Sequence, residues 1–245
     1  MPDDHYRRMK NGSASFPELR AKTATLCRML GAQNLIGMFG HVSIRVPGTD
    51  AILISPGAGA EKTSVVPGDI FVFDLDGTIK KHPERTVPIE WRIHTQIHRD
   101  RPEVLCIAHL HAPNATLLGI ARRAIEPVFL HGAFLHHGVP TWDNPRLVAT
   151  DAMAADLSAT LGAGLAVQMR GHGTVIAAAS AEEAFFCSMF LEENARQQLQ
   201  AAMLGGAIAL SHEEAVACAE GTLGNPRLLD LVWAYHARRV ELPAG

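Results

Sequence analysis

The stretch VLCIAHLH, residues 104–111, is an apolar run of strand length and predicts a buried β-strand. Because side chains alternate along a strand, His109 and His111 project from one face and the apolar residues next to them from the other. Two buried imidazoles need hydrogen-bond partners, since an unpaired polar group in an apolar environment is costly. One divalent cation would satisfy both rings, whereas the alternative is a pair of core histidines bonded to the backbone.

Helical and strand-like patterns alternate on both sides of this run, which indicates one α/β domain. A helix that begins at Pro17 and ends at Gly31 is predicted by residues recurring at three or four: Leu19, Thr23, Leu26 and Leu30. The other predicted helices cover 89–100, 113–120, 147–161 and 180 to about 205, with helical periodicity again over 211–239. The other predicted strands cover 38–46, 51–55, 69–75, 127–134, 165–170 and 174–179. We expect residues 1–15 to be a polar tail and 16–245 a single domain, without repeats or a linker.

The composition excludes several classes of protein. With 47% hydrophobic residues and a net charge of −3, the chain is too apolar and too weakly charged to be disordered. Lys+Arg (22) do not exceed Asp+Glu (25), which argues against a nucleic-acid partner. No run of about 20 apolar residues predicts a membrane span. The start lacks the apolar segment of a secretory signal, and the four scattered cysteines fit a reducing cytosol, so a cytoplasmic location is expected.

Two further residues complete a candidate metal site. His172 lies between Gly171 and Gly173, which permit a tight turn and a close backbone approach, although such a turn can also be purely structural. Three histidine ligands would leave positions open for substrate, as in catalytic rather than structural sites. Glu90 stands in the first turn of the helix over 89–100, either as an acid matched to the helix dipole or as a carboxylate that moves a proton.

Two other stretches only partly match known functional motifs. His94 and His98 are one helical turn apart, but Thr95 follows His94, so the HExxH pattern of metalloproteases is absent and a supporting or surface role is expected. The stretch 57–63, GAGAEKT, has Glu61 where a phosphate-binding loop needs glycine.

Taken together, these residues resemble the class II aldolase/adducin family. The resemblance covers roughly residues 18–205 and is carried by GHVSIR (40–45), ISPG (54–57), EWRIH (90–94), RPEV (101–104), HLH (109–111) and GHG (171–173). It implies an α/β/α layered domain around a central, largely antiparallel sheet, and a homotetramer with its site near a subunit boundary. It also implies His109, His111 and His172 as metal ligands, with Glu90 as acid/base or transient ligand.

Two departures indicate a branch of that family. Its sugar-phosphate aldolases commonly have Gly-Asn where this chain has Gly40-His41, and a pair of serines where it has Pro88-Ile89. Proline has no N–H and isoleucine no side-chain donor, so a phosphate would lose hydrogen bonds here. The segments PVFLHGAFL (127–135), MRGHG (169–173) and ENAR (193–196) resemble a decarboxylase branch, whose members act on hydroxylated aromatic or pyridine carboxylates.

We therefore predict a divalent-metal-dependent decarboxylase, a carbon–carbon lyase, for a hydroxylated aromatic or heteroaromatic (di)carboxylate. The cation would stabilise an enolate, and Glu90 would protonate the carbon, a role that near pH 7 needs the pKa of its carboxyl raised towards that value. Zinc suits three imidazoles best, although manganese, cobalt or iron could bind the same ligands. One alternative is an aldolase or epimerase acting on a sugar phosphate or sugar acid; another is an adducin-like head that binds partners without catalysis.

Six residues form the predicted contacts with the small carboxylate substrate. Arg45 and Arg170 would grip a carboxylate together with His41, because guanidinium recognises carboxylates in a bidentate manner. Ordinary ion pairs are the alternative for the two arginines. Ser43, Ser55 and His131 complete the predicted substrate-binding set.

Overall fold

The centre of the fold is one sheet, seen in a computed structural model that describes residues 15–81 and 84–241. Within these residues eight strands follow the order β4-β3-β2-β1-β5-β8-β7-β6. Neighbouring strands are antiparallel except β6 and β7, which are parallel. The strands are β1 (His41–Arg45), β2 (Ala51–Ile54), β3 (Phe71–Asp74), β4 (Ile79–Lys81), β5 (Cys106–Leu110), β6 (Thr141–Trp142), β7 (Ala166–Met169) and β8 (Gly173–Ala178). The predicted α/β class with a largely antiparallel sheet is confirmed.

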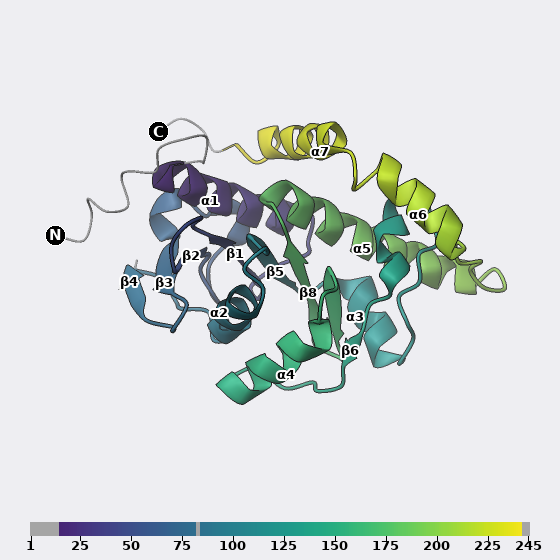
Figure 1. Ribbon diagram of the computed structural model, residues 1–245, viewed down its shortest axis with the longest axis horizontal. Coiled ribbons are helices and arrows are strands. Elements are labelled where there is room, and N and C mark those ends of the chain that lie inside the picture. Colours follow the sequence, from purple (N-terminus) through teal and green to yellow (C-terminus); the bar gives the residue numbers. More distant parts are fainter. Residues whose placement is uncertain (1–14, 82–83, 242–245) are drawn as a thin grey trace.

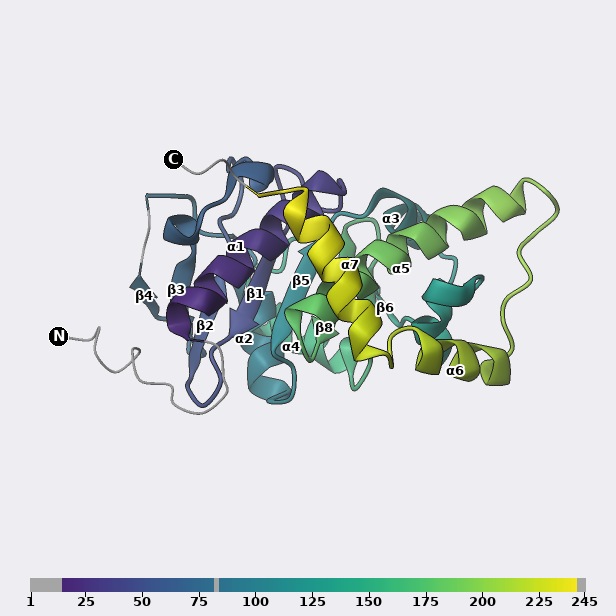
Figure 2. The same cartoon turned by 90° about the horizontal axis from the view of Figure 1, so that it is seen from above.

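Helices cover both faces of the sheet (Figure 1). Helices α1, α5 and α7 lie on one side, whereas α2 and α4 lie on the other, and from above α7 crosses over α1 and α5 (Figure 2). The helices are α1 (Phe16–Ala32), α2 (Trp91–Asp100), α3 (Pro113–Ile120), α4 (Asp151–Leu161), α5 (Ala181–Ala202), α6 (His212–Gly221) and α7 (Pro226–Arg238), and the 3-10 segments are η2 (Lys62–Ser64), η3 (Pro67–Asp69) and η4 (Leu130–His137). Among these described residues, no helix is long and apolar enough to cross a membrane.

The alternation of β1 and β5 divides the interior between the two layers. Val42 and Ala108 pack into the core under α1 and α5, whereas Ile107 packs into the core that contains Ile93 and Ile97 of α2. All four residues of the predicted stripe in α1 are buried, as expected of a helix whose apolar face meets the sheet. Each fully buried leucine of this kind stabilises the fold by roughly 1.5–3 kcal/mol.

The strand predicted over 127–134 is wrong, because this segment forms η4 and its approach. Its backbone is satisfied by a side chain of α5 instead of a partner strand: the Val128 N–H donates to Asn194 Oδ1 at 2.9 Å, and Asn194 Nδ2 donates to the Glu126 carbonyl at 2.7 Å. The side-chain amide of Asn194 therefore provides the hydrogen bonds that a neighbouring strand would otherwise provide.

One helix boundary and one strand pairing also differ from expectation. Helix α4 begins at Asp151, four residues later than predicted, because the hydroxyl of Thr150 accepts the N–H of Met153 and caps it there. The parallel pairing of β6 with β7 was not predicted. The predicted tail lies outside the described residues except for Ser15, which is the N-cap of α1.

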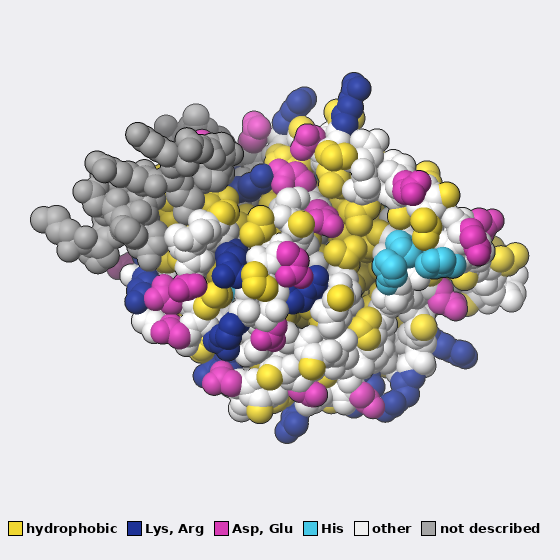
Figure 3. All heavy atoms as spheres, viewed as in Figure 1, with side chains coloured by type: hydrophobic (Ala, Val, Ile, Leu, Met, Phe, Trp, Pro, Cys, Tyr) yellow, Lys and Arg dark blue, Asp and Glu magenta, His cyan; other side chains and the backbone are white. Residues whose placement is uncertain are grey.

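On the face drawn in Figure 3, acidic and basic side chains are interspersed, so neither sign of charge dominates. A few histidine side chains show on this face, near α6 (Figure 3). His136 of η4 is half-buried and His212 of α6 is exposed, with ring centroids 5.6 Å apart, and neither belongs to the buried histidine cluster described below.

Candidate metal centre

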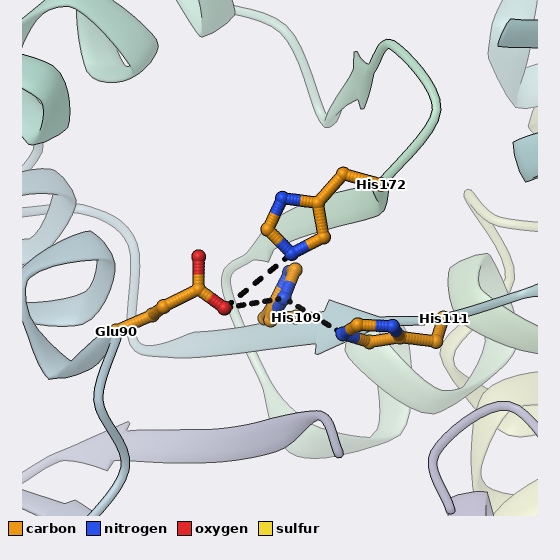
Figure 4. A group of neighbouring side chains, drawn as sticks. All are labelled: Glu90, His109, His111 and His172. Atoms are coloured by element: carbon orange, nitrogen blue, oxygen red, sulfur yellow. Dashed lines mark hydrogen bonds and ion pairs between the residues drawn. The ribbon is translucent and has the colours of Figure 1, made fainter. Parts of the chain in front are cut away.

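Four side chains converge at the carboxyl end of β5: Glu90, His109, His111 and His172 (Figure 4). Each offers one ligand atom, and these atoms all lie within 4.8 Å of one another. The four residues come from the N-cap of α2, from β5, from the position just after β5, and from the turn between β7 and β8. The chain therefore brings distant segments to one point.

The side chains of His109, in β5, and His111, just after it, lie on the same face of the sheet, as the alternation predicts. His109 lies opposite His41 of β1 and Val175 of β8, in the middle of the sheet. Although β5 ends at Leu110, the alternation continues for one residue, and Nε2 of His111 lies 3.2 Å from Nε2 of His109.

The turn that carries His172 requires both of its glycines. Gly171 has φ +66°, a conformation that residues with a side chain rarely adopt. A Cβ on Gly173 would lie 2.1 Å from the carbonyl oxygen of Leu110, which is impossible without moving the backbone. The glycines therefore allow His172 to approach the end of β5.

The unpaired nitrogens fit a cation. Nδ1 of His109 lies 3.3 Å from the Thr174 carbonyl, which can only accept, so Nδ1 carries the proton and Nε2 has a free lone pair. Both ring nitrogens of His172 are buried without a hydrogen-bond partner among the described residues. Unpaired buried nitrogens are costly, and three imidazoles with one carboxylate form a donor set that divalent transition metals accept.

Glu90 is held on one oxygen and points the other at the histidines. Its Oε1 accepts the backbone N–H of Val148 at 2.8 Å, a partner that no local sequence pattern indicates. Its Oε2 lies 3.4 Å from Nε2 of both His109 and His172. The carboxylate is thus fixed in direction within the cluster.

Burial acts to raise the pKa of Glu90, but the neighbouring rings of His109 and His172 outweigh burial and lower the pKa below its usual value. This direction is opposite to the raised pKa that a proton donor working near pH 7 needs. This lowering applies when both Nε2 atoms carry protons, whereas histidine ligands bind a metal in the neutral form through an unprotonated nitrogen. Burial, with the charges of the neighbouring histidines, lowers the pKa of His111 to about 3, so this ring is neutral at pH 7.

Three of the predicted substrate-binding residues lie in or near β1. His41 is 4% exposed, and its ring centroid is 5.1 Å from that of His109, beside the cluster. Ser55 is buried, and its hydroxyl accepts the N–H of Val42 at 3.0 Å. Ser43 is also fully buried, between His94 and His98, so its hydroxyl contacts these rings.

The other three predicted substrate-binding residues contact protein groups outside the metal cluster; they are Arg45, Arg170 and His131. Arg45 donates to the carbonyl of His98 at 2.6 Å, at the opposite end of β1 from His41. The guanidinium of Arg170 pairs with Asp143, and the ring of His131 stacks on Phe190 with centroids 4.5 Å apart. Their substrate roles stay predictions.

Lys62 is a buried cation that the sequence did not single out for this site. It is 2% exposed, and its Nζ donates to the carbonyls of Pro56 at 2.6 Å and Gly57 at 2.8 Å. The stretch 57–63 fails as a phosphate loop, and the sequence signal for Lys62 is its place just after the ISPG motif whose carbonyls it binds.

Comparison with known proteins identifies the family of this chain. The family model described as Class II Aldolase and Adducin N-terminal domain matches residues 21–199. A 3,4-dihydroxyphthalate decarboxylase of Arthrobacter keyseri is 30% identical over 203 residues, which are 77% of this chain and 81% of that protein.

Solved structures share the fold. An aldolase II superfamily protein from Pseudomonas syringae has a TM-score of 0.81 at 22% identity, covering 94% of this chain and 95% of the other. An L-fuculose 1-phosphate aldolase has a TM-score of 0.75 at 23% identity, covering 86% and 99%. At these identities the likeness concerns the fold alone.

Proposed function

Because the chain belongs to the class II aldolase and adducin family, we propose that it is a divalent-metal-dependent decarboxylase of a hydroxylated aromatic or heteroaromatic carboxylate. The observation that carries the proposal is the convergence of three imidazoles and one carboxylate, with both nitrogens of His172 unpaired. An adducin-like head without catalysis has no need of such a set, since it leaves buried polar groups unsatisfied.

The substrate class is supported by the relative and by one surface beside the cluster. The 3,4-dihydroxyphthalate decarboxylase spans most of this chain. Ile89, next to Glu90, is 58% exposed and follows Pro88, so neither residue offers a side-chain donor to a phosphate. An apolar side chain at this position suits a flat aromatic ring better than a sugar phosphate.

In the reaction, His109, His111 and His172 would hold the cation, and Glu90 would serve as the proton donor. A bound divalent cation supplies Lewis acidity, which stabilises negative charge on a substrate oxygen next to the breaking bond. The bond between the ring and the carboxylate breaks, carbon dioxide leaves, and the electron pair remains with the ring. Glu90, placed by the Val148 N–H, would pass a proton from water to that carbon.

Three finer points belong to the same proposal. Zinc is the metal that three imidazoles suit best, with manganese, cobalt or iron possible in the same ligands. A cytoplasmic homotetramer is the assembly that we propose. Leu204 and Ile208, which follow α5, are 90% and 92% exposed, and apolar side chains of this kind favour a subunit contact.

The test is an assay of the metal-loaded protein on 3,4-dihydroxyphthalate and on hydroxypyridine carboxylates, with carbon dioxide release as the measurement. We expect release that disappears in His109→Ala, together with the bound metal, and in Glu90→Gln, which keeps the metal. The matched controls, His137→Ala and Glu220→Gln, alter exposed side chains and should remain active. Aldehyde formation from L-fuculose 1-phosphate without carbon dioxide release would replace this proposal with an aldolase, and full activity of Glu90→Gln would remove its proton role.

A further inference from the structure

A line of buried polar groups leads away from the metal centre, between β1 and α2. We call it the histidine chain; its members, in order, are the Val104 carbonyl, His98, Ser43, His94 and His41. His98, Ser43 and His94 are all fully buried. Such a row of polar groups inside a core is costly unless each donor finds an acceptor.

The distances define one continuous chain. Nδ1 of His98 lies 3.1 Å from the Val104 carbonyl, and its Nε2 lies 2.9 Å from the hydroxyl of Ser43. The same hydroxyl lies 2.7 Å from Nδ1 of His94. Nε2 of His94 in turn lies 2.6 Å from Nδ1 of His41.

The carbonyl at the far end sets the direction of every bond. A carbonyl only accepts, so His98 must carry its proton on Nδ1 and present a bare Nε2 to the serine. Ser43 has a single proton and gives it to His98, so its oxygen must accept from Nδ1 of His94.

The same rule carries the direction to the end of the chain. His94 now has a bare Nε2, so the proton between the last two rings belongs to Nδ1 of His41. His41 is left with an unprotonated Nε2, which has no partner among the described residues. Each ring is neutral in this arrangement, consistent with burial, which lowers the pKa of His98 to about 3.

We propose that the histidine chain holds His41 in the Nδ1–H form and so presents its Nε2 as a hydrogen-bond acceptor beside the metal centre, for a hydroxyl of the substrate. The position of the ring supports this role, because its centroid lies 5.1 Å from that of His109. A hydroxylated carboxylate would donate to His41, whereas an unhydroxylated one would leave the acceptor unpaired. This use of the acceptor rests on the proposed function, but the protonation of His41 does not.

In this assignment Ser43 is a positioning residue that acts through two histidines without touching the substrate. Its hydroxyl is the only link in the chain that can be removed without deleting a ring. Ser188 offers a matched control, since it is also fully buried in the sheet–helix core but its hydroxyl bonds only to the Ala184 carbonyl of its own helix, at 2.6 Å.

The first experiment is 15N NMR of the zinc-loaded protein, labelled at histidine, with His41→Asn used to assign the ring. We expect a protonated Nδ1 and an unprotonated Nε2 on His41 in the wild type and in Ser188→Ala. In Ser43→Ala the His41 signals should show a mixture of both tautomers, and Ser43→Thr, which restores a hydroxyl, should return them. A wild-type His41 protonated on Nε2 would overturn the proposal, and this measurement needs no substrate.

The second experiment is kinetic. We expect Ser43→Ala to keep its zinc and to lose about 10- to 100-fold in kcat/KM on the hydroxylated carboxylate, as other partners that orient site histidines do. An unchanged kcat/KM together with unchanged tautomers in a folded Ser43→Ala would also overturn the proposal. If the wild type releases no carbon dioxide from any substrate but its His41 has the expected tautomer, the proposed function fails and the histidine chain stands.

Discussion

Acid should destabilise this protein through His98, by an amount that follows from its burial. His98 is fully buried, and burial lowers its pKa from 6.5 to about 3. Below pH 6.5 the unfolded chain therefore binds a proton that the folded protein does not. The contribution of His98 to stability is present above pH 6.5 and is lost as the pH falls towards 3.

The expected magnitude is about 1.2 kcal/mol of unfolding free energy between pH 6 and pH 5. A single proton bound only by the unfolded state changes stability by about 1.4 kcal/mol per pH unit, and an unfolded histidine is roughly nine-tenths protonated over this interval. The other buried histidines of the site add their own losses, so the comparison must be made against a variant of His98.

Urea denaturation of the metal-free protein at pH 6 and pH 5, for the wild type and His98→Gln, measures this contribution. We expect the loss of stability on acidification to be about 1.2 kcal/mol smaller in His98→Gln, whatever the stability of the variant at pH 6. His137→Gln changes an exposed ring and should lose as much as the wild type. An equal loss in the wild type and His98→Gln, with cooperative unfolding in both, would refute the assignment of a neutral buried His98.

Three other perturbations test the site and its support. Removing the metal with a chelator should lower the melting temperature, because a ligand of the folded state alone stabilises it, and added Zn²⁺ should restore it. Gly173→Ala should lower both metal content and stability, since its Cβ would meet the Leu110 carbonyl at 2.1 Å; a variant with full metal content would contradict this. Asn194→Ala leaves the Val128 N–H and the Glu126 carbonyl unpaired and should cost about 1–3 kcal/mol in urea denaturation, whereas a cost near zero would show that water replaces the amide.

The parts of this fold that the sequence predicts are those set by short-range periodicity. The stripe from Leu19 to Leu30 in α1 and the alternation at His109 and His111 depend on residues within a turn or a strand. The strand prediction over 127–134 is wrong for the opposite reason, because the structure there depends on a residue far away in the sequence. It is apolar enough to be a strand, but Asn194 reaches its backbone from 66 residues away and no partner strand lies beside it.

The candidate site was predictable as a set of residue types but not as an arrangement. Gly171 and Gly173 marked His172 as a close approach, and the family resemblance placed it with Glu90. No local pattern shows that the Val148 N–H holds Glu90, since that contact spans 58 residues. The direction of the Glu90 pKa shift is likewise not predictable from the sequence, because it depends on which nitrogens of two other residues face the carboxylate.

The histidine chain shows how two ordinary repeats can build a polar line through a core. Four residues of an α-helix advance about 6 Å, and two residues of a strand advance about 6.6 Å. Rings at i and i+4 of α2 can therefore alternate with every second side chain of β1, and the observed contacts follow that order. Ile93 and Ile97 of the same helix pack in an apolar core beside the histidine chain. The spacing of His94 and His98, which resembles part of a zinc motif, is thus better explained by the rise of a helix lying along a strand.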